Sequence, residues 1–187
     1  FVQPNRQSDV GARPLYSTFS LWDTFRAAHP LYTILCPKED ALFVESMLDQ
    51  CDRQGYLPIW SLGCGENHCM IGHHAVPVIV DACLKGLVPL EQVERAYRAV
   101  RQSLTVNHKP VNDGTWGLVK EDWDVLDRYG YYPFDKLSGW YEGRHVIGES
   151  VSRTVECAYD DACAARLATA LGRTKDAAYF LRRAQNW

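Results

Sequence analysis

The hydrophobic residues of this chain recur at helical spacing along most of its length. Residues 38–53, for example, place Leu42, Val44, Met47, Leu48 and Cys51 on one helical face. Helices are expected over residues 18–34, 38–53, 68–85, 90–104, 120–129 and 151–171, and from Thr174 as N-cap through to Trp187. Pro30 predicts a kink, and Gly86 and Gly172 are C-terminal stop signals. No segment has the alternation of a convincing strand.

Two regularities predict how these helices pack. The helices at 18–34, 68–85 and 151–171 are apolar nearly all round, which is typical of an inner layer, whereas the others are amphipathic. The long connections, 54–67 and 105–150, both lead into an inner helix. The pattern predicts an all-α fold, an (α/α) toroid with about three helical hairpins of an (α/α)6 six-hairpin barrel. A free-standing solenoid is the alternative, although no sequence repeat supports it.

Composition excludes several partners. The chain has 187 residues and a net charge of −3 without a basic run, which argues against nucleic acid or an anionic membrane. No apolar run approaches the roughly 20 residues of a membrane span. The seven cysteines are odd in number and lack C-x-x-C spacing, so neither a zinc knuckle nor a redox motif is indicated. Cys83 and Cys163 lie in apolar runs and are expected to be small core residues.

Polar residues at the starts of the inner helices are the candidate site. Trp22 can face the apolar side of a sugar, Asp23 can accept paired hydroxyl hydrogen bonds, and Arg26 lies close enough to pair with Asp23. A helix cap and a core tryptophan are the alternative reading of the first two. A second group follows the long connection 54–67 and consists of Glu66, Asn67 and His68. These side chains can contact hydroxyls or a hard cation, or can simply cap a helix.

Other polar residues are read as structural. His73 and His74 are expected to be buried, because His68 and His73 lack the i, i+4 spacing of a helical zinc pair. Glu156 and Asp160 share a face and are expected to link to Arg or Tyr of neighbouring helices. Asp160 and Asp161 lack the third acid of a terpenoid synthase metal motif, so that function is rejected.

The chain resembles family 92 glycoside hydrolases, which are bacterial calcium-dependent exo-acting α-mannosidases. The resemblance runs from about residue 8 to residue 187 and is carried mainly by three segments, 16–31 with Trp22-Asp23-Thr24-Phe25-Arg26, 65–75 with Gly65-Glu66-Asn67-His68, and 150–161. Residues 55–60 and 81–86 also match, whereas residues 10–15 are shorter than the family's usual connection.

The resemblance implies that residues 1–187 are part of a single (α/α)6 glycosidase catalytic domain, truncated at its C-terminal side. The implied enzyme hydrolyses terminal mannose from glycans with inversion, at an α-1,2 linkage, with calcium as cofactor and in the periplasm or outside the cell. Trp22, Asp23, Arg26, Glu66, Asn67 and His68 would then be substrate-binding residues, with no metal ligand assigned.

The family's general acid and base lie downstream of the matching segments, so no catalytic residue is expected in this chain. The chain alone should therefore be inactive, and it should expose the apolar faces of its first and last inner helices, which the remainder of its own polypeptide would cover. Two other classes stay open: a non-catalytic carbohydrate-binding or scaffold module, and another toroid glycosidase.

Overall fold

The computed structural model describes residues 14–62, 65–66, 68–106, 108, 123–133 and 149–187. Its helices are α1 (Leu21–Thr24), α2 (Ala28–Leu35), α3 (Pro37–Gln54), α4 (Ala75–Leu84), α5 (Leu90–Thr105), α6 (Trp123–Tyr129), α7 (Ser150–Ala170) and α8 (Thr174–Arg183). A short antiparallel hairpin, β1 (Ser61–Leu62) and β2 (Gly65–Glu66), was not predicted. None of the described helices has the length and apolarity needed to cross a bilayer.

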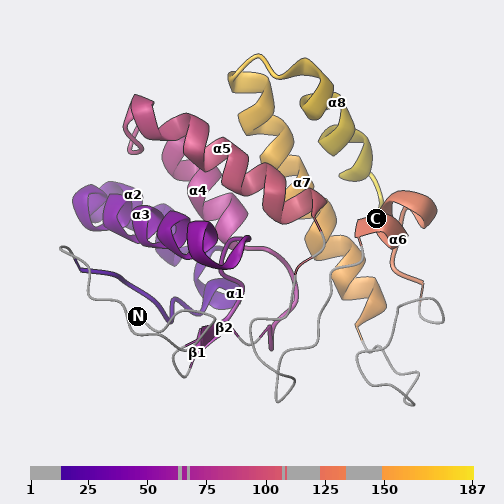
Figure 1. Ribbon diagram of the computed structural model, residues 1–187, viewed down its shortest axis with the longest axis horizontal. Helices are drawn as coiled ribbons and strands as arrows, with labels where there is room; N and C mark the ends of the chain where they lie inside the picture. The colour runs from indigo at the N-terminus through magenta and orange to yellow at the C-terminus, as the bar shows by residue number, and fades with distance from the viewer. Residues whose placement is uncertain (1–13, 63–64, 67, 107, 109–122, 134–148) are drawn as a thin grey trace.

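The helices pack as antiparallel hairpins side by side, as predicted. The pairs are α2 with α3, α4 with α5, and α7 with α8, and α4 also contacts both α2 and α7. Figure 1 shows these pairs fanning around a common end, at which α1 and the β1–β2 hairpin lie. The fold is therefore all-α, with the layered helical hairpins of a portion of an (α/α) toroid.

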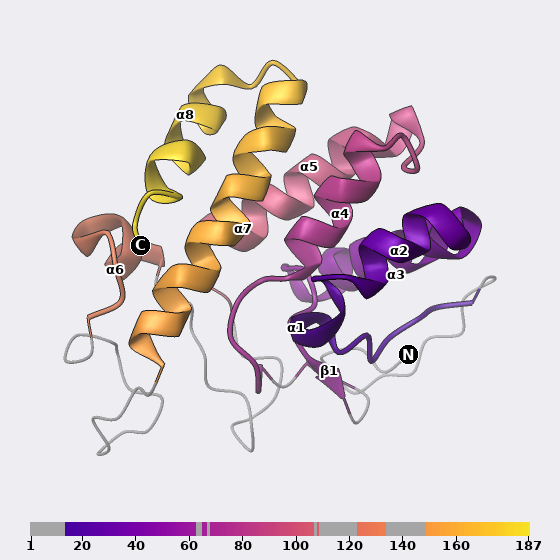
Figure 2. The ribbon, with the colours of Figure 1, turned by 180° about the vertical axis from the view of Figure 1, so that it is seen from behind.

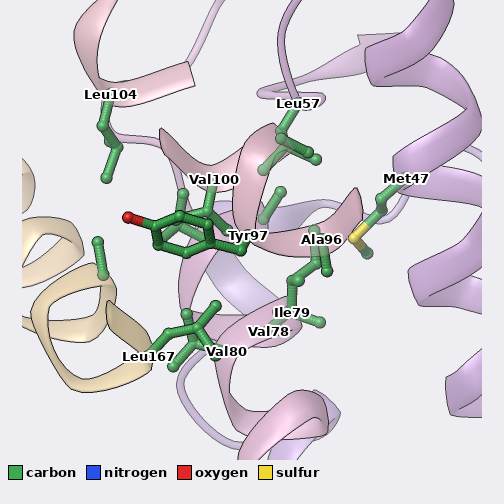
Figure 3. Packing of buried hydrophobic residues seen from close by; sticks show 14 of the residues in the cluster. Met47, Leu57, Val78, Ile79, Val80, Ala96, Tyr97, Val100, Leu104 and Leu167 are labelled. Carbon is green, nitrogen blue, oxygen red and sulfur yellow. The ribbon is translucent and has the colours of Figure 1, made fainter. Parts of the chain in front are cut away.

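The hydrophobic core lies between α4, α5 and α7. Every residue of α4 from Ala75 to Val80 is buried, as an inner-layer helix requires. Figure 3 shows Val78 and Ile79 of α4 close to Ala96 and Val100 of α5, with Leu167 of α7 completing the contact. Burying an aliphatic side chain of this size stabilises the fold by about 1.5–3 kcal/mol.

The first predicted helix is two helices. The expected single helix over 18–34 is interrupted by a turn between α1 and α2, and the kink expected at Pro30 is absent. Pro30 instead lies in the first turn of α2, where the proline breaks no intrahelical hydrogen bond because the first N–H groups of a helix have no carbonyl partner.

Other boundaries also differ from the prediction. The helix expected from residue 68 begins at Ala75, and the last helix, expected to continue to Trp187, ends at Arg183. The residues after Arg183 form turns, in which the Asn186 N–H donates to the Arg183 carbonyl. Thr174 is the first helical residue rather than the N-cap, which is Arg173. Residues 120–122 of the expected short helix lie outside the described part of the chain.

Apolar side chains are exposed at both edges of the helical layer, as expected. Ile34 and Leu35 of α2 are 73% and 71% exposed, and Val151 of α7 is 76% exposed, with Val155 and Tyr159 nearly half exposed. Val151, Val155 and Tyr159 are four residues apart in turn, so they share one face of α7, and exposed apolar faces are typical of interfaces. The described cysteines are free thiols, and Cys83 and Cys163 are partly buried against the core.

Candidate functional site

The starts of the inner helices converge at one end of the molecule. Figures 1 and 2 both place α1 beside the β1–β2 hairpin, at the end where α4 and α7 begin. Phe25, just after α1, stacks on His74, just before α4, with ring centroids 3.9 Å apart. The His73 N–H donates to Asp160 Oδ2 of α7 over 2.7 Å. The helix starts therefore lie at the same end, as predicted, although the contact with α7 is at Asp160, about three turns beyond its first residue.

Backbone strain gathers in the segments that lead into these helices. Among the described residues, the non-glycine positions with positive φ are Thr18 (62°) and Ser20 (51°) before α1, His68 (53°) before α4 and Glu149 (71°) before α7. Left-handed backbone at a non-glycine residue costs on the order of 1–3 kcal/mol and is found disproportionately at active sites and ligand clamps. The strain independently indicates that this end carries function.

The Trp22–Asp23–Arg26 group lies on the surface at this end. Trp22 is partly buried, while the Asp23 carboxylate, in the first turn of α1, is exposed and has no hydrogen bond or ion pair with the described residues. The expected Arg26–Asp23 ion pair is wrong. The chain turns after Thr24, and the Arg26 guanidinium instead lies 4.7 Å from the Trp22 ring centroid and 3.5 Å from Glu156 Oε1 of α7.

Glu66 is buried and organises the loop around it. Its Oε2 accepts the Ile59 N–H (2.7 Å), and its Oε1 accepts the N–H groups of Trp60 (2.8 Å) and His68 (2.9 Å). Only 2% of Glu66 is exposed. These contacts show a carboxylate that fixes the chain leading into α4. Asn67, predicted beside it, lies outside the described residues.

His68 belongs to a buried cluster of neutral imidazoles. Its Nε2 lies 2.8 Å from the Tyr56 hydroxyl, and Tyr56 stacks on His108 at 4.1 Å. Burial, with a smaller effect of the Arg153 charge, lowers the pKa of His68 to about 4, and burial lowers that of His108 to about 3. His73, 4.9 Å from His108, has a pKa lowered well below its usual value, again chiefly by burial.

Glu156 and Asp160 link three segments through His74. His74 Nδ1 lies 3.1 Å from Asp160 Oδ1, and its Nε2 lies 3.2 Å from Glu156 Oε2, in contact but not aligned as a hydrogen bond. The predicted link to an arginine or tyrosine is found for Glu156, through the half-exposed Arg26, but it is wrong for Asp160, whose hydrogen bonds with the described residues go to His73 and His74. The prediction that His73 and His74 are buried is also confirmed.

Asp161 faces a different partner from Asp160. The Arg183 guanidinium donates from Nε to Asp161 Oδ2 (2.6 Å) and from Nη2 to Oδ1 (2.5 Å). Arg183 Nη2 also donates to the Leu104 carbonyl, so this buried pair joins α8 to α7 and α5. The two aspartates thus have different partners, His73 and His74 for Asp160 and Arg183 for Asp161, and neither belongs to a metal-holding group among the described residues.

The described residues contain no cluster of acidic side chains of the kind that would hold calcium. Calcium takes about six to eight oxygen ligands. Within the described ranges no group of three or more His, Cys, Asp or Glu side chains is arranged to hold a metal ion. The buried Glu66 and Asp160 carboxylates already accept N–H donors.

Comparison with known proteins identifies the class of this protein. The helical layer and its polar end are those of a glycoside hydrolase catalytic fold. Residues 2–187 match the glycosyl hydrolase family 92 catalytic domain. The chain belongs to this family.

Solved structures agree with this assignment. A family GH92 α-mannosidase from Bacteroides thetaiotaomicron, in complex with mannoimidazole, superimposes with a TM-score of 0.77 at 35% identity, over 100% of this chain and 22% of that one. A family GH92 inverting mannosidase from B. thetaiotaomicron VPI-5482 gives a TM-score of 0.77 at 30% identity, over 92% of this chain and 21% of that one.

A curated relative is an uncharacterized secreted glycosidase from Arthroderma benhamiae, 29% identical over 164 residues. The match covers 87% of this chain and 20% of the relative. This chain therefore spans about a fifth of the length of the relatives that it matches.

Proposed function

We propose that the intact protein containing this chain is an exo-acting α-mannosidase that removes terminal mannose from glycans with inversion. The observation that carries this proposal is the family match over residues 2–187, together with 35% identity to a solved α-mannosidase. The relative described as an inverting mannosidase supports the stereochemical part. This chain is proposed to supply the sugar-binding half of the site.

The exposed end of α1 has the chemistry to hold one terminal sugar. A sugar packs its apolar C–H face on an indole, and a carboxylate accepts hydrogen bonds from two adjacent hydroxyls. Trp22 offers the ring and Asp23 offers a carboxylate that the described residues leave unengaged. Arg26 holds the indole by lying over it. Glu66 and His68 are proposed to support this site from behind, because both are buried.

The chemical step is proposed to depend on groups outside the described residues. Inversion requires two carboxyl groups about 6.5–9.5 Å apart, one as general acid and one as general base. Glu66 and Asp160 are held by N–H donors, and Glu156 is paired with Arg26 and His74. We therefore assign no catalytic acid or base here and propose that the remainder of the intact protein supplies them.

Three further properties are proposed from the family resemblance. The reaction depends on calcium, with ligands outside the described residues. The preferred linkage is α-1,2. The enzyme works in the periplasm or outside the cell, which the secreted glycosidase relative supports.

The test uses the intact protein with α-1,2-, α-1,3- and α-1,6-linked mannobiose. Proton NMR of the first product should show β-mannose, which reports inversion, and EDTA should abolish release until calcium is restored. The 187-residue chain alone, with calcium, should release none. No mannose from any mannoside would refute the proposed function, and release by the chain alone would show that the catalytic pair lies within it.

A further inference from the structure

A line of polar side-chain contacts runs from the core to the candidate site. It begins at Asp160, which is fully buried, passes through His74 and Glu156, and ends at Arg26, whose side chain is 49% exposed. The successive contacts are 3.1 Å, 3.2 Å and 3.5 Å. The proposed function uses only the outer end of this line, where Arg26 lies over the Trp22 ring, and gives no role to the residues behind Arg26.

The middle of the line cannot move easily. Phe25 stacks on the His74 ring with an interplanar angle of 12°. On another side lies Gly72, with φ of +81°, where an added Cβ would come within 2.5 Å of His74 Nε2. The imidazole is thus held closely, with one ring nitrogen next to an Asp160 oxygen and the other next to a Glu156 oxygen.

Glu156 connects the closely held His74 ring to Arg26 at the surface. Its Oε2 is next to His74, which leaves Oε1 facing Arg26 Nη2. The Arg26 guanidinium in turn lies 4.7 Å from the Trp22 centroid and 4.6 Å from the Phe25 centroid. A long, half-exposed arginine side chain has many rotamers, so an anchoring carboxylate determines whether it stays on the ring.

We propose that Glu156 is a positioning residue for the sugar-binding site, acting through Arg26 to fix the Trp22 indole. This proposal rests on the proposed function. A ring fixed in advance binds a sugar without first having to be ordered. Loss of the Glu156 carboxylate should therefore weaken binding of substrate and transition state alike, so KM should rise while kcat changes little.

The experiment is a double-mutant cycle in the intact protein. Glu156→Gln should raise KM for an α-mannoside about 3- to 10-fold with kcat within about twofold, and Arg26→Met should do at least as much. The double variant should be no worse than Arg26→Met alone. Glu94→Gln, which breaks the exposed Glu94–Arg173 pair on the outer helices, is the matched control and should change neither constant. Affinity for mannoimidazole should follow KM.

Two results would overturn the proposal. If the KM effects multiply in the double variant, Glu156 does not act through Arg26. If kcat falls as much as kcat/KM, Glu156 takes part in the chemical step itself.

A crystal structure of the intact Glu156→Gln variant gives a readout that does not depend on activity. Arg26 should leave the Trp22 ring, and an unmoved Arg26 would refute the link even if the wild-type protein released no mannose. If Glu156→Gln does not fold, Arg26→Met tests the link from the surface: an unchanged KM would refute it.

Discussion

Glu66 offers the sharpest test of how the loop before α4 is held. Glu66→Gln keeps the size of the side chain but replaces one carboxylate oxygen with an NH2 group. In the unmutated protein three backbone N–H groups donate to the Glu66 carboxylate, at 2.7, 2.8 and 2.9 Å. The amide oxygen of glutamine can accept from only part of this set, and its NH2 group would face another donor.

The expected loss follows from those contacts. A hydrogen bond to a charged group contributes about 1.5–3 kcal/mol, and a buried donor left without a partner costs about 1–3 kcal/mol. Contacts that share one carboxylate do not add fully. We expect Glu66→Gln to lower the free energy of unfolding by about 2–4 kcal/mol, and Glu66→Ala by at least as much.

Urea denaturation of the intact protein measures the free energy, and hydrogen exchange locates the change. The amides of Ile59, Trp60 and His68 should exchange faster in Glu66→Gln, while amides in α5 keep their protection. Glu39→Gln, at an exposed position on α3, is a control of the same chemical change. A Glu66→Gln protein within about 0.5 kcal/mol of wild type, with these three amides still protected, would refute the reasoning.

Three further predictions concern the same structure. The free energy of unfolding should fall as the pH is lowered from 6.5 to 4.5, by up to about 1.4 kcal/mol per pH unit for each neutral buried histidine. His68 and His108 have pKa values of about 4 and 3 when folded, so the unfolded chain binds more protons, and a flat urea-midpoint profile would contradict this. Arg183→Leu should lose about 3–5 kcal/mol in urea denaturation because Asp161 stays buried without its cation, and adding Asp161→Leu should recover part of it. Asp23→Ala should lower kcat/KM at least about tenfold with an unchanged melting temperature, since the carboxylate is exposed; unchanged kinetics would remove Asp23 from the site.

Local patterns predicted the outer helices well. The helix expected over 90–104 is Leu90–Thr105, and that over 38–53 is Pro37–Gln54. Both have an apolar face on one side only, and the spacing of the apolar residues in the sequence is enough to reveal such a face. The start of α4 could not be read in this way. The backbone before it is held by Asp160, which is 87 positions away from His73, so the sequence near residue 68 still resembled a helix.

The candidate site was predicted unevenly for the same reason. Trp22 and Asp23 stand together in one helical turn, where a motif is visible. His108 joins His68 and His73 only in space, since no regular spacing relates them. The predicted partner of Arg26 was wrong because local spacing can suggest only a nearby partner such as Asp23. The observed partner, Glu156, is 130 positions away and comes close to Arg26 only in the folded protein.

The left-handed residues before the inner helices also matter for engineering. Glycine at Thr18 or Glu149 would relieve local strain, and a screen for heat resistance could select it. Such a change would also let the first turn of α1 or α7 shift, and α1 carries Trp22 and Asp23, the side chains proposed to bind sugar. Thermostable variants should instead be sought on the solvent faces of α5 and α8, where better helix formers can raise stability without loosening the end that is proposed to bind substrate.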